Sequence, residues 1–250
     1  MELFVEKLLG FMMVLTRISA FFLLLPVFGW KSIPVRAKAG MIVLIAIFFS
    51  MITRPPLDAK QASVLKAIML IANEATYGLA LGSIVAVLFS AVKLCGQIIE
   101  REMGLTMAEI LDPLTGESTM PLAGLLEMIF IVLFFSANGH HLFLLIISRS
   151  YDTFPPGSIP TVSVLVGGIT EAGSALLMAG LRLAAPMLAT FLVFLVVLAV
   201  LARIVPEMNI LFISLPLRVG LGLLMMVIFL PLISGFTGEL ANWMSKLLPL

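Results

Sequence analysis

The sequence predicts an all-α membrane protein built from long helical hairpins. Hydrophobic residues make up 61% of the 250 residues and charged residues only 12%, whereas about a quarter of a soluble domain is charged. Apolar stretches recur along the chain, several of them close to the length of about 20 residues that crosses a bilayer as a helix. Charged residues nevertheless lie inside these stretches. The natural surroundings of such a chain are lipid and other protein.

Six apolar stretches define the expected helices. The first is long enough for one membrane span, whereas the second is short. The third and fifth are too long for one span, and we expect Asn73 and Glu74 to interrupt the third and Pro186 to kink the fifth. The six stretches are residues 8–27, 40–53, 64–92, 122–148, 172–205 and 210–233.

Four charged residues lie within these apolar stretches. A charge at the bilayer centre costs roughly 2.5–3.5 kcal/mol on insertion scales, so each needs a partner or water. We expect these charges at helix interfaces, paired with an opposite charge in this chain or on a neighbouring one. The alternative is a path for a small solute, which buried charges and broken helices also form in transporters. The four residues are Arg17, Glu74, Glu127 and Arg182.

Small residues mark expected helix contacts. Gly78 and Gly82 are four residues apart, and Gly220 opens the last helix. Such positions let the backbones of two helices approach closely. They pack either the chain's own bundle or a neighbouring subunit, and the sequence leaves both open.

Several classes of function find little support. Cys95 is the only cysteine, and His140 and His141 are adjacent, so that on a helix the two rings point about 100° apart and do not readily share a metal. The net charge of +1 gives no basic stripe for nucleic acid. We therefore expect no enzyme, no cofactor and no bound metal or nucleic acid.

The longest polar stretch, residues 100–121, mixes acidic and apolar side chains. A solvent-exposed loop has no need of the apolar Met107, Ile110, Leu111 and Met120. The stretch is either an ordinary loop or a segment packed into a cavity as a plug.

Short motifs spread over almost the whole chain form one ordered set. They are Arg17, Pro26-Val27-Phe28-Gly29, Pro34, Arg36, Gly96, Gly104, Asp112-Pro113, Asn138-Gly139-His140, Ala185-Pro186, Pro206, Asn209 and Pro216-Leu217. No single motif is specific, but the ordered set resembles the flagellar biosynthetic protein FliR family of the type III export apparatus. Glu207 and Arg218 depart from the Gln and Lys that are common in the family, and the residue choices favour the flagellar over the virulence branch.

The resemblance implies a structural and gating subunit of a protein-conducting export gate. Residues 1–171 would form a FliP-like region and residues 172–250 a FliQ-like helical hairpin, together one subunit of a helical ring. The implied partners are FliP-like and FliQ-like subunits, an FlhB-like protein, and unfolded flagellar proteins as cargo. The implied place is the flagellar basal body in the bacterial inner membrane, with the gate at its periplasmic face. A virulence-type homologue and a small-solute transporter are the alternatives.

The resemblance also assigns a role to the central loop. Residues 104–121 would help to close the pore, which agrees with their mixed composition. The residues assigned to this plug are Gly104, Met107, Ile110, Leu111, Asp112, Pro113 and Met120.

Overall fold

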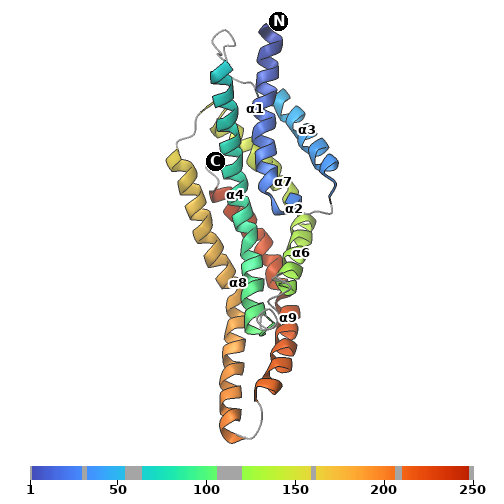
Figure 1. The fold of residues 1–250 in the computed structure, drawn as a ribbon, viewed down its shortest axis with the longest axis vertical. Coiled ribbons are helices and arrows are strands. Elements are labelled where there is room, and N and C mark those ends of the chain that lie inside the picture. The colour runs from blue at the N-terminus through green and yellow to red at the C-terminus, as the bar shows by residue number, and fades with distance from the viewer. Residues whose placement is uncertain are drawn as a thin grey trace, which may run out of the picture. The chain divides into compact units, whose positions relative to one another are not determined.

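The structure, a computed structural model, describes residues 2–29, 33–53, 64–105, 120–158, 162–205 and 210–247. Every regular element in these ranges is a helix (Figure 1), which confirms the predicted all-α class. Several of the helices are much longer than average. The helices are α1 (Glu2–Leu24), α2 (Pro26–Gly29), α3 (Val35–Ile52), α4 (Val64–Glu102), α6 (Pro121–Ser136), α7 (Gly139–Thr153), α8 (Val162–Ile204) and α9 (Ile210–Leu247).

The observed helices begin and end at other residues than the predicted stretches, as where α3 begins at Val35 and α9 ends at Leu247, and three differences matter most. Helix α4 runs through Asn73 and Glu74 without the predicted interruption, because Glu74 has buried partners. The apolar stretch 122–148 is two helices, α6 and α7, bent by 75° at a short break. At that break Asn138 adopts a left-handed φ of 60°, which Asn tolerates better than most residues. Helix α8 begins at Val162, well before residue 172, and contains Pro186.

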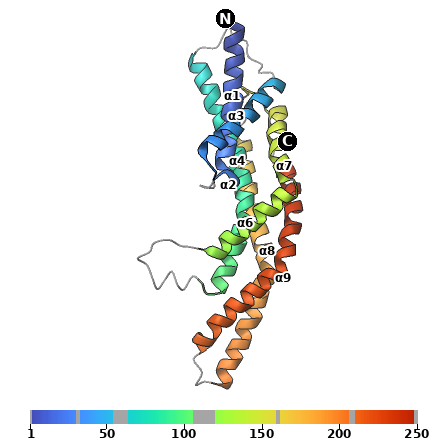
Figure 2. The same cartoon turned by 90° about the vertical axis from the view of Figure 1, so that its right-hand side faces the viewer.

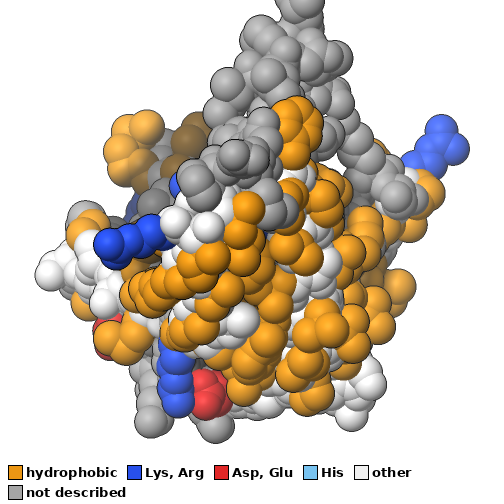
Figure 3. All heavy atoms as spheres, turned by 90° about the horizontal axis from the view of Figure 1, so that it is seen from below, with side chains coloured by type: hydrophobic (Ala, Val, Ile, Leu, Met, Phe, Trp, Pro, Cys, Tyr) orange, Lys and Arg blue, Asp and Glu red, His pale blue; other side chains and the backbone are white. Residues whose placement is uncertain are grey.

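In the part of the chain that the structure describes, five helices are long and apolar enough to cross a membrane, or up to six if the bent pair α6 and α7 forms one span. The surface of the described residues is correspondingly apolar. Seen from one end, hydrophobic side chains cover most of the described surface, and the Lys and Arg side chains stand apart from one another (Figure 3). Such a surface needs lipid or protein around it.

The chain divides into two compact units. The first comprises Met1–Phe89, Asn138–Ser174 and Leu240–Leu250, and the second Ser90–Ala137 and Ala175–Glu239. In the first unit α3 packs along α1, as Figures 1 and 2 both show. Aromatic residues form much of its core: the ring of Phe143 lies edge-on to that of Phe21 and tilted against that of Phe89, with centroids 6.4 and 6.0 Å apart. The predicted division at residue 171 is a different one, and it stays a prediction.

Glycines allow close backbone contacts inside each unit. In the first unit a Cβ on Gly78 would collide with the backbone oxygen of Arg17, and a Cβ on Gly82 would lie 2.7 Å from that of Phe21. These two glycines therefore face α1 of the same chain. Around Gly220 a Cβ would meet nothing within 4 Å, so its predicted packing role would need another chain.

Candidate functional site

The first unit contains a buried ion pair between α1 and α4. Arg17 and Glu74 are only 2% and 1% exposed, and Arg17 Nε donates to Glu74 Oε2 at 2.5 Å. Removing two charges from water costs several kcal/mol each, which a close pair offsets only when the remaining polar atoms are also bonded. Two of the four predicted buried charges are thus partners of each other.

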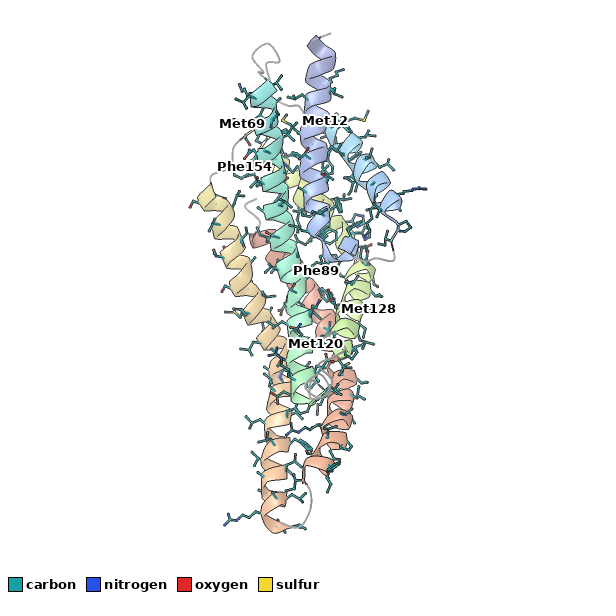
Figure 4. The ribbon with its side chains drawn as sticks, viewed as in Figure 1. Met12, Met69, Phe89, Met120, Met128 and Phe154 are labelled. Atoms are coloured by element: carbon teal, nitrogen blue, oxygen red, sulfur yellow. The ribbon has the colours of Figure 1, made fainter. Side chains whose placement is uncertain are left out.

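A second nitrogen of the Arg17 guanidinium, Nη1, binds the end of α7. Its Nη1 donates to the backbone oxygens of Ser150 at 3.1 Å and Phe154 at 2.9 Å. Carbonyl groups at a helix C-terminus lack further helical N–H donors and carry partial negative charge, so a cation there is stabilising. Phe154, which follows α7, lies beside α4 in Figure 4 and stacks edge-on against Tyr77 with ring centroids 5.3 Å apart.

Two aromatic rings flank the Arg17 guanidinium. Its Cζ lies 4.7 Å from the ring centroid of Tyr77 and 4.4 Å from that of Tyr151. Cation–π contacts are strongest where the cation is desolvated, as it is here. The Tyr151 hydroxyl donates to the backbone oxygen of Val14 at 3.3 Å. We call Arg17, Glu74, Tyr77, Ser150 and Tyr151 the arginine cluster.

Helix α4 also holds the segment that follows α7. Glu74 Oε1 accepts a hydrogen bond from the backbone N–H of Gly157 at 2.8 Å. The preceding residue, Asn73, donates through its Nδ2 to the backbone oxygen of Ser158 at 2.7 Å. The arginine cluster therefore fixes α1, α4, the end of α7 and the start of the connection to α8 relative to one another.

The other two predicted charges have weaker partners in the second unit. Glu127, 23% exposed, lies 3.5 Å from Lys93, and Arg182, 71% exposed, lies 3.6 Å from Glu239. Partly exposed pairs at these distances contribute little to stability. Arg182 is thus on the surface of the chain, and its predicted place in a helix interface stays a prediction about a neighbouring chain.

The predicted plug lies mostly outside the described residues, which exclude 106–119. Its first residue, Gly104, ends α4: with φ of +78° it donates to the Arg101 oxygen at 3.0 Å, while Leu105 donates to that of Glu100 at 3.3 Å. This is the hydrogen-bond pattern of a Schellman motif, in which glycine is preferred. Met120 forms the N-cap of α6.

A carboxylate that sequence reasoning did not single out connects the two ends of this loop. Glu100 is 1% exposed, and its Oε2 accepts a hydrogen bond from the backbone N–H of Ala123 at 3.2 Å. Ala123 is in the first turn of α6, where N–H groups lack helical acceptors and a negative charge is favourable. In the sequence, the signal for this contact was an acidic residue, Glu100, on an apolar helix face. Pro121, which begins the next helix after the loop, was the second part of that signal.

The remaining candidate residues, Cys95, His140 and His141, form no recognisable binding or catalytic site with the other described residues. Cys95 is buried, and the rings of His140 and His141 lie 4.2 Å apart. Among the described residues no group of three or more His, Cys, Asp or Glu could hold a metal ion.

Comparison with known proteins matches the chain almost end to end. The model of the family "Bacterial export proteins, family 1" matches residues 8–243. The chain is 30% identical over 236 residues to "Flagellar biosynthetic protein FliR" of Escherichia coli (strain K12), covering 94% of this chain and 89% of that protein.

Relatives include both flagellar and other export proteins. Identity to FliR of Bacillus subtilis (strain 168) is 28% over 232 residues, 90% of this chain and 87% of that protein. Identity to "Yop proteins translocation protein T" of Yersinia pestis is also 28% over 232 residues, 91% of this chain and 88% of that protein. The resemblance found from the motifs is confirmed: the chain is a member of the bacterial export proteins, family 1.

Proposed function

We propose that this chain is a structural and gating subunit of the flagellar type III protein export gate. The observation that carries the proposal is the match to the family over residues 8–243, together with FliR relatives that the chain covers over most of their length. In this proposal the chain is not an enzyme and needs no cofactor. Energy for transport comes from other components.

Helix length supports assembly with other membrane proteins. Helices α4 and α8 contain 39 and 43 residues, about 58 and 65 Å at 1.5 Å per residue. The hydrocarbon core of a bilayer is only about 30 Å thick. FliP-like and FliQ-like subunits, with an FlhB-like protein, would cover the apolar surface that lipid does not.

Within the gate, the two parts of the chain would take the places of one FliP-like and one FliQ-like subunit. Residues 1–171 would act as a FliP-like subunit and residues 172–250 as a FliQ-like hairpin in a helical ring. The loop 104–121 would close the resting pore, with Glu100 holding its two ends together. The gate would sit at the periplasmic face of the inner membrane in the flagellar basal body and pass unfolded flagellar proteins.

A virulence-type secretion system is the second candidate. The identity of 28% to Yop proteins translocation protein T equals that to the Bacillus subtilis FliR. The two branches differ in cargo, so identification of the exported proteins separates them.

The decisive experiment is deletion of the gene in the source organism. Hook and filament proteins should disappear from the medium while their cellular amounts persist, and re-expression of the chain should restore export. A tagged chain should co-purify with FliP-like and FliQ-like proteins. Normal flagellar export in the deletion strain, with loss of another set of secreted proteins, would assign the virulence role; normal export of both sets would overturn the proposal.

A further inference from the structure

Helix α3 differs from the long helices in how it fits a bilayer. Its 18 residues, Val35–Ile52, are about 27 Å long, close to the hydrocarbon thickness of about 30 Å. To fit within that thickness, α4 with its 39 residues would need a tilt of about 60°, beyond the observed range of 0–40°. Only 11% of the α3 span is buried in the chain, against 61% of the α4 span.

One face of α3 packs on the first unit and the other carries large apolar side chains. Ala46 and Phe49 are buried, and the ring of Phe49 lies 5.8 Å from that of Tyr151. On the outward face Leu44 is 70% exposed and Phe48 is 61% exposed. Their neighbours on this face continue the stripe at helical spacing. These neighbours are Met41, Ile47, Met51 and Ile52.

The composition of this outward face favours lipid over a second helix. Helix contacts inside membranes use small and polar residues, whereas the stripe from Met41 to Ile52 consists of long aliphatic side chains and a phenylalanine. The small residues on that side, Ala37 and Gly40, are confined to the first two turns. A Cβ on Gly40 would meet nothing within 4 Å.

A basic residue at the start of α3 points to lipid headgroups. Arg36 is exposed and lies in the first turn, which contains no acidic residue. Cations there oppose the helix dipole, whose positive end is the N-terminus. Phosphate groups at a membrane surface would offset this cost, since an anionic surface attracts basic residues that lie close to it. Long basic side chains also extend to the interface while their stems cover apolar surface.

We propose that the outward face of α3 contacts lipid, with Arg36 at the phosphates of anionic phospholipids. Leu44, Phe48 and Met51 contact acyl chains, while the overlong helices turn much of their apolar surface to protein. The inference rests on the membrane location of the chain and not on its role as a gate.

Spin labels on the co-expressed complex in native-lipid nanodiscs test the proposal. In a Cys95→Ala background, which removes the only cysteine, labels at Leu44→Cys and Phe48→Cys should be accessible to oxygen and inaccessible to a water-soluble nickel chelate. The matched control Ile42→Cys, on the side that faces the chain, should be less accessible to oxygen. High nickel accessibility at positions 44 and 48 would indicate water and overturn the proposal.

A second measurement avoids dependence on a labelled cysteine. A photoreactive phenylalanine analogue at position 48 should give no cross-linked protein band in the assembled complex. A band containing a partner or a second copy of the chain, together with low accessibility to both reagents, would show that protein covers this face. Export assays on the same variants test the proposed function independently, so that an α3 face covered by protein would overturn only the lipid proposal.

Discussion

Arg17 and Glu74 form a buried ion pair in which each member also holds a different part of the chain's backbone. Arg17 donates to the oxygens of Ser150 and Phe154, and Glu74 accepts from the N–H of Gly157. Loss of one member leaves the other charged, buried and unpaired. Because of this coupling, the pair acts on the first unit as a whole and not on α1 or α4 alone.

Removal of Arg17 alone should therefore destabilise the protein severely. We expect Arg17→Leu to cost about 3–5 kcal/mol, because Glu74 would keep a desolvated charge. Arg17→Lys should recover little, since an ammonium cannot reproduce the planar guanidinium between two rings with its separate donors. The measurement is the thermal midpoint of the detergent-solubilised protein by gel filtration after heating.

Two variants control this experiment. The double variant Arg17→Leu/Glu74→Leu should be more stable than Arg17→Leu, because no unpaired charge remains. Glu127→Leu, which removes a partly exposed partner of Lys93, should cost at most about 1 kcal/mol through that pair. Equal losses of stability in Arg17→Leu, in the double variant and in Glu127→Leu would contradict this prediction, because the buried pair would then be no more important than the partly exposed one.

The sequence was sufficient to predict the helical class, most of the apolar stretches and the buried charges of Arg17 and Glu74. It did not single out the buried Glu100, and the predicted Arg182 lies on the surface of the chain. It could not predict that Arg17 pairs with Glu74, because a residue type in an apolar stretch does not reveal which distant helix faces it. The expected interruption at Asn73 and Glu74 was wrong for the same reason: two polar residues break a helix only if they lack partners, and here both bind the segment after α7. The bend at Asn138 was hidden inside one continuous apolar stretch.

The two tyrosines of the arginine cluster provide a matched comparison. The Tyr77 hydroxyl is buried and has no hydrogen-bond partner among the described residues, whereas that of Tyr151 donates to the backbone oxygen of Val14. Tyr77→Phe should be neutral or stabilising, and Tyr151→Phe should cost about 0.5–1.5 kcal/mol. Both variants keep a ring beside Arg17, so the thermal midpoints compare the hydroxyls alone. A larger loss in Tyr77→Phe would reveal a bound water on that hydroxyl.

Close packing of α4 on α1 can be tested at Gly78. A methyl group there would meet the Arg17 backbone oxygen, so Gly78→Ala should cost about 1–3 kcal/mol through overpacking. Gly124→Ala in α6 is the control, because a Cβ at that position meets nothing within 4 Å. Alanine is better than glycine in a helix by roughly 0.5–1 kcal/mol, so the control should be slightly stabilised. Thermal midpoints that move in the same direction would argue against the α1 contact.

Glu100 should act on the loop and not only on the stability of α4. Glu100→Gln keeps an oxygen that can accept from Ala123, whereas Glu100→Leu leaves that N–H without its acceptor, at a cost of about 1–3 kcal/mol. We expect faster proteolysis within residues 106–119 in Glu100→Leu than in the wild type, with Glu100→Gln in between. Identical cleavage rates in the three proteins would show that the loop ends are held by other contacts.

The proposed plug makes a separate prediction for the assembled gate. Deletion of residues 107–112 should raise the conductance of small ions through gates reconstituted in a planar bilayer, because the deletion removes apolar side chains that would fill the closed pore. Its anchors, the Gly104 turn and the Glu100 contact with Ala123, lie outside the deletion. A deletion of the same length in another segment outside the described ranges, residues 56–61, should leave conductance unchanged. Conductance that is equal in the two deletions and the wild type would remove residues 107–112 from pore closure, since the anchors and the rest of the gate are the same in all three.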